Sequence, residues 1–370
     1  MSKNSIGLHA LAVTFSMFQV GSTTLFFLGS QAKQDAWLAM LLGAAAGLLL
    51  LAMYLGIHHL DARYDLYELN KVYFGKIIGS IFGLAFIAYF TYEASRNLRD
   101  LSELTVATLL NRTPLFVVAA IALLVIVNCV RYGPKINFLT CIALLPVMIL
   151  GYGSLIVLIL TTGVAHFEFM QPILENGFKP VWDAAIPKII SFPFGQAVLF
   201  LAFFSLVTEK KNLNKAMTLT YCGVAILLTL FNQLIVLVLG PELAAICTYP
   251  LLEVVQVIQM TRVFERADAL FILILFIGIG TKAILFYAGA VIGLQQIAWL
   301  KYKIWVIPLG IVIYAVSFVS PTYTEFVWIG LHLTVTKVWP IFQIALPALL
   351  FVVMLLRKKK RAEGGSKSGG

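Results

Sequence analysis

The stretch Ser191-Phe192-Pro193-Phe194-Gly195-Gln196 lies at the middle of an apolar segment that runs from Ala184 to Val207. The segment is long enough to cross a bilayer as a helix. However, proline removes a backbone donor and clashes with the preceding turn, and glycine weakens the helix that follows. Broken backbone at membrane depth is tolerated only where it is buried in protein or lines a cavity. The segment therefore indicates either a binding site built from the ends of two half-helices or a simple proline kink.

The composition around this stretch is that of an all-α integral membrane protein. The chain has 370 residues, of which 61% are hydrophobic and 12% are charged, and its mean hydropathy is +0.94. These values are far from those of soluble proteins. We expect ten membrane-spanning helices, which run roughly over Leu8–Leu28, Ala36–His58, Ile77–Leu110, Leu115–Val130, Phe138–Gly163, Ala184–Val207, Leu213–Leu239, Phe264–Leu294, Ile304–Val319 and Lys337–Leu356. The segment Tyr249–Met260 is expected to be an interfacial helix on the outer side, and no cleavable signal is expected.

The basic residues predict the orientation of these spans. If the N-terminus is cytoplasmic, the inner loops and tails hold 17 Lys and Arg, whereas the outer loops hold only Lys33, Arg112, Lys179, Arg262 and Lys337. Cytoplasmic loops carry an excess of basic residues, so we expect both termini to be cytoplasmic. The net charge of +10 then reflects membrane topology and does not indicate nucleic-acid binding. Residues 1–361 are expected to form a single polytopic membrane domain, and residues 362–370 a disordered tail.

No pattern of an enzyme or of a metal protein is present. The four cysteines have no metal-like spacing, and the five histidines are scattered along the chain. No phosphate-binding glycine-rich loop and no nucleophile motif occurs. We therefore expect neither catalysis nor a cofactor nor a metal.

The ten expected spans divide into two halves, with an interruption near the start of each half. The first span contains Phe18-Gln19-Val20-Gly21-Ser22-Thr23-Thr24, a polar and glycine-containing patch, and the sixth contains Pro193 and Gly195. Interrupted spans at corresponding positions of two halves indicate the binding site of an inverted-repeat transporter fold. We therefore expect a five-plus-five inverted repeat, with repeat one over about 8–163 and repeat two over about 184–356.

Ionisable residues inside the membrane are costly and usually functional. The third span carries Glu93, Arg96, Arg99, Asp100 and Glu103 at helical spacing, and Tyr92 and Arg96 lie deepest. Asp100 and Glu103 either belong to this set or are solvated where the long helix emerges on the outer side.

The eighth span begins with a predicted interfacial ion-pair cluster, Glu265-Arg266-Ala267-Asp268, and carries Lys282 far from either end. We expect Lys282 to face inward in a structural or coupling role. The alternative is that its ammonium group reaches the membrane interface along the helix.

The whole chain resembles the B subunits of spore germinant receptors, the GerAB and GerBB family. The resemblance is carried by Ser191-Phe192-Pro193-Phe194-Gly195, Glu265-Arg266-Ala267-Asp268-Ala269-Leu270, Lys282 and the turn Asn111-Arg112-Thr113-Pro114. That family is similar to the amino acid–polyamine–organocation transporter superfamily with its LeuT-like fold. The family commonly has Glu where this chain has Gln196, which argues against an ion-coupling role for that position.

The resemblance implies a nutrient sensor in the inner membrane of a dormant spore. Such a subunit acts with an A subunit and a lipoprotein C subunit, and binds an amino acid, a sugar or a nucleoside without consuming it. The implied ligand-binding residues lie on the first, third, sixth and eighth helices: Gly21, Ser22, Tyr92, Arg96, Pro193, Phe194, Gly195, Gln196, Leu199, Thr281 and Tyr287. Glu93, Arg99 and Lys282 are expected to be structural or coupling charges.

Two other function classes fit the same sequence. One is a proton- or sodium-coupled amino acid permease of the same fold, which should carry a titratable or oxygen-rich coupling site. The other is a membrane-embedded scaffold whose cavity is vestigial. The broken helices do not distinguish among the three.

Overall fold

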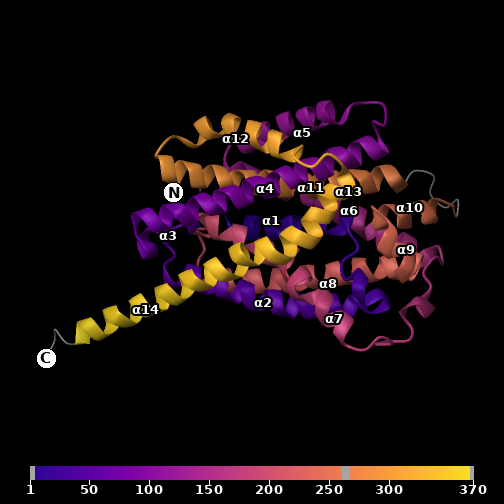
Figure 1. Ribbon diagram of the computed structural model, residues 1–370, viewed down its shortest axis with the longest axis horizontal. Coiled ribbons are helices and arrows are strands. Elements are labelled where there is room, and N and C mark those ends of the chain that lie inside the picture. Colours follow the sequence, from indigo (N-terminus) through magenta and orange to yellow (C-terminus); the bar gives the residue numbers. More distant parts are fainter. Residues whose placement is uncertain (1–4, 261–266, 367–370) are drawn as a thin grey trace.

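The computed structural model describes residues 5–260 and 267–366, with side chains described over 5–258 and 270–358. The described residues form a bundle of helices joined by turns (Figure 1). The first half contains α1 (Leu8–Val20), α2 (Ala36–Leu60), α3 (Leu66–Phe74), α4 (Lys76–Thr108), α5 (Leu115–Val130) and α6 (Pro134–Thr161). The second half contains α7 (Lys179–Ala184), α8 (Leu213–Leu239), α9 (Pro241–Ile246), α10 (Pro250–Met260), α11 (Ala267–Ala298), α12 (Tyr302–Ser317), α13 (Tyr323–Trp328) and α14 (Leu346–Ser366).

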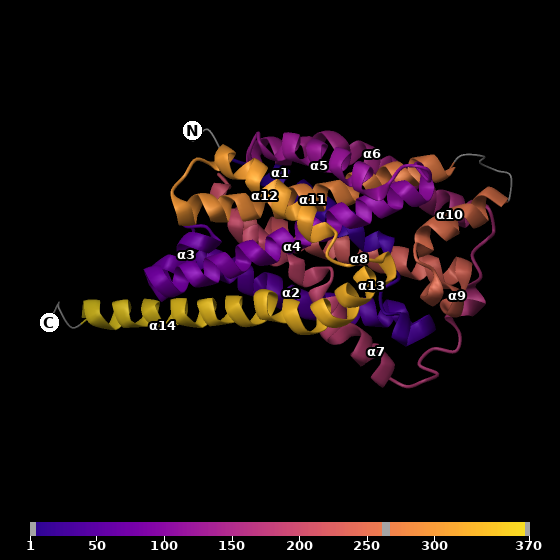
Figure 2. The same ribbon diagram turned by 45° about the horizontal axis from the view of Figure 1, so that its top comes forward.

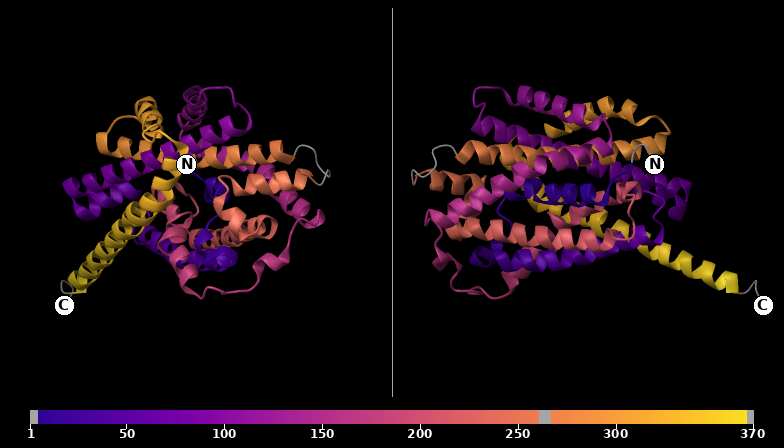
Figure 3. Two further views of the ribbon diagram at one scale, coloured as in Figure 1. Left: turned by 45° about the vertical axis from the view of Figure 1, so that its right-hand side comes forward. Right: turned by 180° about the vertical axis from the view of Figure 1, so that it is seen from behind.

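Two long helices, α4 and α11, pack along each other and form the centre of the bundle. α12 and α5 lie side by side on one edge, and α2 packs against α8 on the opposite edge (Figures 1 and 2). α3 and the far end of α14 lie at one end of the bundle, while α9 and α10 lie at the other (Figure 1). α14 reaches beyond the bundle in every view (Figure 3).

Within the described part of the chain, seven helical segments are long and apolar enough to cross a membrane: Ser30–Leu60, Lys76–Thr108, Pro134–Thr161, Lys179–Ala202, Leu213–Leu239, Leu270–Ala298 and Tyr323–Lys358. Leu115–Val130 and Tyr302–Ser317 are apolar but shorter. The chain is therefore an all-helical, multi-pass membrane protein. The count of ten spans stays a prediction, because α1, with 13 residues, is too short to meet the same length criterion.

Regular α-helical geometry ends within both the first and the sixth predicted span. α1 ends at Val20, and a 3₁₀ turn follows over Gly21–Leu25. In the sixth predicted span, a π-helical turn over Ala185–Ile189 contains the extended residue Ile186, and a 3₁₀ helix begins at Phe194 directly after Pro193. A third irregular region, which the sequence analysis did not predict, consists of π-helical turns over Ile329–Val338 and Ile341–Ala345. Such turns are frequent at functional sites.

Several boundaries differ from those predicted. The last helical segment begins at Tyr323, so Lys337 lies on an exposed helical position and not in an outer loop. α3 is an additional helix, which begins at a capping box formed by Asp65 and Glu68. The predicted cluster Glu265-Arg266-Ala267-Asp268 lies outside the described side chains. α14 continues through Ser366, where we expected disorder from residue 362, and residues 367–370 lie outside the described residues.

Candidate functional site

A chain of buried polar side chains joins three helical segments at the centre of the bundle. Gln196, on the 3₁₀ helix Phe194–Ala202, donates from Nε2 to Glu93 Oε2 on α4 at 2.9 Å. Its other amide atom, Oε1, accepts a hydrogen bond from Lys282 Nζ on α11 at 2.8 Å. The three side chains are fully or almost fully buried, with Lys282 0% exposed.

The amide of Gln196 is suited to this position because it offers a donor to the carboxylate and an acceptor to the ammonium. A buried charge is tolerated when it is paired and hydrogen-bonded. Glu93 and Lys282 therefore compensate each other through one neutral side chain. The predicted inward-facing position of Lys282 is what the structure has, and the alternative of a side chain reaching the membrane interface is wrong.

Lys282 also contacts the irregular part of the first span. Its Nζ lies 3.4 Å from Thr23 Oγ1, and Thr23 donates to the Gln19 carbonyl at 2.6 Å. The ammonium also lies over two aromatic rings, at 4.7 Å from the Phe192 centroid and 5.5 Å from the Phe18 centroid. The polar chain thus reaches the first, third, sixth and eighth predicted spans.

Two glycines allow the first span and α11 to approach this closely. A Cβ placed on Gly21 would lie 2.8 Å from Lys282 Cγ and 2.9 Å from the Gly278 carbonyl oxygen. A Cβ placed on Gly278 would lie 3.0 Å from the Gly21 Cα. Small residues let helix backbones come into contact in membranes. Ser22, next to Gly21, is also buried.

A glutamine that was not predicted from the sequence, Gln343, packs against the interruption of the sixth span. Gln343, between α13 and α14, is 0% exposed and donates from Nε2 to the Tyr89 hydroxyl at 2.8 Å. The Tyr54 hydroxyl donates to the Gln343 carbonyl at 2.6 Å and lies 3.4 Å from the Gly195 carbonyl. A Cβ on Gly195 would lie 2.8 Å from the side-chain Cδ of Gln343. A lone glutamine within an apolar span was the available signal.

The remaining charges of α4 form a second cluster one to two turns further along the helix. Arg99 donates to Glu103 at 2.8 Å and to the Ser317 carbonyl at 3.1 Å. Asp100 accepts from the Tyr323 hydroxyl at 3.0 Å and is buried. The solvated alternative is therefore wrong for Asp100, because α13 covers this part of α4.

Arg96 lies between the two clusters and is surrounded by aromatic rings. Its guanidinium lies 5.3 Å from the Phe326 centroid and 5.5 Å from the Trp339 centroid. Its Nη1 has no hydrogen-bond partner among the described residues. Tyr92, one turn earlier, lies 3.3 Å from the Thr334 hydroxyl. Both residues therefore face the irregular tenth span.

Four predicted wall residues point elsewhere. Phe194 packs against Tyr221 of α8, with ring centroids 5.3 Å apart. Leu199 is fully buried against Gly289 of α11. Tyr287 donates to the Val306 carbonyl of α12. The structure does not bring these residues to the polar chain.

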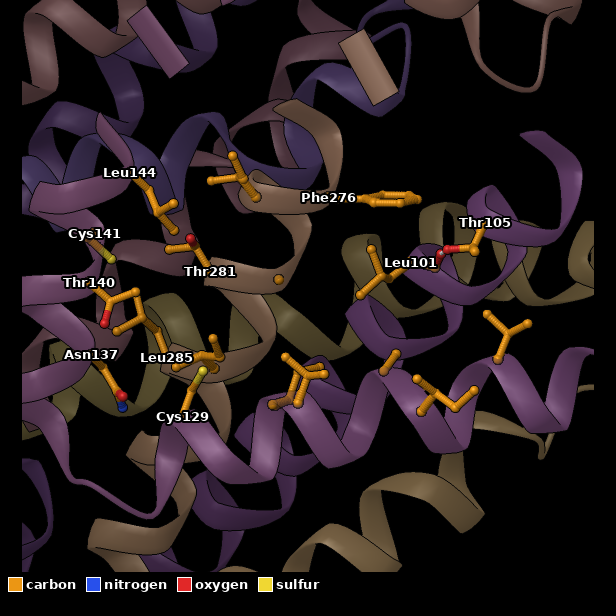
Figure 4. A pocket seen from close by; sticks show the side chains of 18 of the residues that line it. Leu101, Thr105, Cys129, Asn137, Thr140, Cys141, Leu144, Phe276, Thr281 and Leu285 are labelled. Atoms are coloured by element: carbon orange, nitrogen blue, oxygen red, sulfur yellow. Dashed lines mark hydrogen bonds between the residues drawn. The ribbon is translucent and has the colours of Figure 1, made fainter. Parts of the chain in front are cut away.

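Thr281, the fourth, lines an apolar cavity of about 390 Å³ between α4, α5, α6 and α11. Figure 4 shows it beside Cys141 and Thr140 at one end of this cavity, with Phe276 and Leu101 at the other. Asn137 also lines the cavity, and its side-chain nitrogen and oxygen have no partner among the described residues. Neither Lys282 nor its hydrogen-bond partners Thr23 and Gln196 line this cavity.

Two backbone hydrogen bonds join the first and sixth spans near the end of the bundle that carries α3. The Ile6 amide donates to the Leu206 carbonyl at 2.9 Å, and the Thr208 amide donates to the Ile6 carbonyl at 3.1 Å. The segment before α1 is therefore tied to the segment that leaves the sixth span. Within the described residues, no group of three or more His, Cys, Asp and Glu side chains is arranged to hold a metal ion.

Comparison with known proteins assigns the sequence of this chain to a family. Residues 5–326 match the family described as "Spore germination protein". The chain is 29% identical over 367 residues to spore germination protein KB of Bacillus subtilis (strain 168), a match that covers 98% of this chain and 97% of that protein.

Solved structures of transporters share the fold. One is MHP1, a nucleobase-cation-symport-1 family transporter, with a TM-score of 0.70 and 13% identity over 94% of this chain and 77% of that one. Another is MhsT in complex with L-phenylalanine, with a TM-score of 0.63 and 14% identity over 94% of this chain and 88% of that one. These transporters have the LeuT fold, which confirms the fold type expected for this chain.

Proposed function

The chain belongs to the spore germination protein family, and we propose that it is the nutrient-sensing membrane subunit of a spore germinant receptor. In this proposal the subunit resides in the inner spore membrane with both termini cytoplasmic. It has ten spans in a five-plus-five inverted repeat, with broken first and sixth helices. It acts together with an A subunit and a lipoprotein C subunit. The nutrient is a small molecule, an amino acid in the first instance and a sugar or a nucleoside as the alternatives.

The observation that carries the proposal is the polar chain Glu93–Gln196–Lys282. It lies where the two irregular spans meet the two central helices, and Lys282 contacts the first span at Thr23. Intramembrane ionisable residues are by default functional. A ligand that enters between the first and sixth spans has to change the contacts among Glu93, Gln196 and Lys282. Its binding therefore affects α4 and α11 at the same time.

We place the nutrient beside Gly21, Ser22 and Pro193–Gln196, with Tyr92 and Arg96 on the third helix as the next wall. In this structure, the position of a Cβ on Gly21 or Gly195 is already filled by neighbouring atoms. Binding therefore requires the first and sixth spans to separate from α11 and from Gln343. Thr281 and Tyr287 contact the nutrient only if the eighth helix turns, and Phe194 and Leu199 only if the sixth span turns.

The receptor works without transport if the nutrient binds one arrangement of these spans more tightly than the other, because only a difference in affinity shifts the equilibrium. The new arrangement is passed to the A and C subunits, which start germination. The coupling is reciprocal, so nutrient affinity must differ between the free subunit and the assembled receptor. Equal affinity in the two states would argue against this mechanism.

One observation favours the alternative function, a proton- or sodium-coupled amino acid permease. Glu93 and Lys282 are both ionisable, and their charges compensate across a single side chain. Ionisable residues inside membrane segments mark ion pathways and proton relays in transporters. Gln196 between them is neutral and supplies no coupling charge, which favours the receptor.

Uptake and germination measured on the same protein distinguish the two functions. For the receptor, labelled amino acids bind to the purified chain in proteoliposomes but do not accumulate under a proton or sodium gradient. For the permease, accumulation depends on the gradient, and deletion of the gene leaves nutrient-triggered germination unchanged.

A further inference from the structure

A polar cavity of about 640 Å³ lies at the end of the bundle that carries α3, apart from the proposed nutrient site. It is formed by the end of α2, the turn before α3, α3 itself and the far part of α14. Its lining includes Asp61, Arg63, Tyr73, Arg357 and Lys358. The proposed germinant site uses none of these residues.

The cavity has an excess of positive charge. Three cations line it, Arg63, Arg357 and Lys358, against one carboxylate, that of Asp61. Asp61 is paired with Arg63 through two hydrogen bonds of 2.8 Å. These hydrogen bonds hold the pKa of Asp61 below its ordinary value, so the carboxylate stays ionised at neutral pH. Three cations and one anion leave two positive charges facing one cavity.

Two of the three cationic side chains, those of Arg63 and Arg357, make hydrogen bonds to the protein. A guanidinium has five N–H donors, and the pair with Asp61 uses two of those of Arg63. Arg357 donates to the Val72 carbonyl at 3.2 Å and lies 5.9 Å from the Tyr73 ring centroid. The cavity is therefore a partly organised anion site, whose further donors point to a ligand with several acceptor oxygens.

Part of the cavity lining is apolar, and the cavity lies where two apolar spans end. Leu60, Val72 and Met354 line it together with the cations. Leu60 is the last residue of one apolar span, and Arg357 and Lys358 end another. A ligand that matches both the cationic and the apolar side chains of the cavity has an anionic headgroup joined to an apolar chain.

We propose that this cavity binds the phosphate headgroup of an anionic phospholipid, with the phosphate between Arg63, Arg357 and Lys358 and the glycerol end of the acyl chains against Leu60, Val72 and Met354. Basic pockets between membrane helices are recognition sites for anionic headgroups. A free phosphate offers the same oxygens but gains nothing from the apolar wall. A bound lipid links α14 to the turn between α2 and α3.

The test uses the full chain in nanodiscs that contain phosphatidylglycerol and phosphatidylcholine, with the lipids that stay bound to the protein counted by native mass spectrometry. We expect phosphatidylglycerol to be retained in preference to phosphatidylcholine. Arg357→Gln and Lys358→Gln should each lower its affinity about fivefold, the value of one basic residue near a charged membrane surface. Lys303→Gln, which removes an exposed lysine outside the cavity, is the control and should leave the affinity unchanged.

A second arm distinguishes the two sources of phosphate. Inorganic phosphate is titrated into the phosphatidylglycerol nanodiscs, and we expect it not to displace the lipid. Displacement of the lipid by inorganic phosphate, or equal retention of both lipids, would overturn the proposal. So would an effect of Lys303→Gln equal to that of Lys358→Gln. Lys358 is exposed, so its variant should fold, and since no nutrient is involved, the result is independent of the proposed receptor function.

Discussion

At the scale of single residues, the centre of the molecule depends on one amide that separates two opposite charges. Gln196 satisfies a carboxylate with its donor and an ammonium with its acceptor. Removing one charge leaves the other buried without its partner. Replacing both charges by neutral groups removes that penalty.

We therefore predict that Lys282→Met destabilises the protein strongly, because the buried Glu93 keeps only Arg96 of its two cationic neighbours and Gln196 Oε1 loses its donor. The loss in unfolding free energy should be about 3 kcal/mol, and Glu93→Gln added to Lys282→Met should recover most of it. Denaturation titrations of the purified protein measure both values. Lys303→Met, at an exposed position, is the control and should change little. Additive losses in the double variant would contradict the pairing.

The residues of this centre were only partly predictable from the sequence. Glu93, Gln196 and Lys282 stand out, since each is polar within an apolar span. The direction in which the Thr281 side chain points was not predictable. Thr281 is next to Lys282 in the sequence, and hydropathy does not show which face of an apolar helix packs against which neighbouring helix. Gln343 was missed for the same reason, since its role appears only when the tenth span lies against Tyr89 and Gly195.

At the scale of elements, the contact between the first span and α11 depends on two small residues. The three heavy atoms nearest to a Cβ on Gly278 would be backbone atoms of Gly21, at 3.0 to 3.2 Å. Backbone atoms do not move aside as a flexible side chain does. The neighbouring Gly280 has nothing within 4 Å of its Cβ position.

Because of this difference, alanine substitutions of Gly278 and Gly280 form a matched pair. We expect Gly278→Ala to lower the unfolding free energy by about 2 kcal/mol through overpacking. Gly280→Ala should be neutral or stabilising by up to about 1 kcal/mol, since alanine favours the helix. Thermal unfolding of the two variants measures the difference. Equal effects of the two substitutions would contradict the close approach.

The docking of α3 is expected to depend on pH. Asp65 caps α3, and it accepts hydrogen bonds from the Tyr67 and Glu68 amides, both at 2.9 Å, and from Gln296 of α11 at 3.2 Å. Burial raises the pKa of Asp65 from 3.8 to about 7. The unfolded chain therefore releases this proton near pH 4, whereas the folded chain keeps it until about pH 7. The contribution of Asp65 to stability is thus present below pH 4 and is lost as the pH rises towards 7.

We predict that Asp65→Asn reduces the fall in unfolding temperature between pH 5 and pH 8, because asparagine caps a helix without titrating. Unfolding curves at a series of pH values give the comparison. Asp183→Asn replaces an exposed carboxylate and should keep the pH dependence of the unsubstituted chain. An unchanged pH dependence in Asp65→Asn would show that Asp65 does not cause it.

The sequence predicts an interruption in the first and in the sixth span, and irregular helical turns lie in both. α1 ends at Val20, directly before Gly21, whereas α7 ends at Ala184, nine residues before Pro193. The π-helical turns around Trp339 were not predicted, although Pro340 lies between them, because the expected tenth span began only at Lys337. The helix propensities of proline and glycine identify the helix breaks that these residues cause through the backbone. Helix irregularities that depend on packing against another helix, here α4, are not identified in this way.

At the scale of the whole molecule, the proposed topology places the turn before α12 on the cytoplasmic side and the turn before α9 on the outer side. We predict that Glu242→Cys is labelled by a membrane-impermeant maleimide in intact cells. Lys303→Cys should be labelled only after permeabilisation. The four native cysteines are replaced by alanine in both cases. Labelling of both positions from outside would contradict a membrane crossing by α11.

The most direct test of the account is the release of dipicolinic acid from spores exposed to a panel of amino acids, sugars and nucleosides. The spores lack this gene, or carry it unsubstituted or with Lys282→Met. The account predicts that deletion abolishes the response to particular nutrients while germination by non-nutrient triggers persists. The unsubstituted gene restores the response, and Lys282→Met at equal membrane abundance does not. An unchanged nutrient profile after deletion, or a full response with Lys282→Met, would contradict the claim that the buried polar chain of this subunit senses the nutrient.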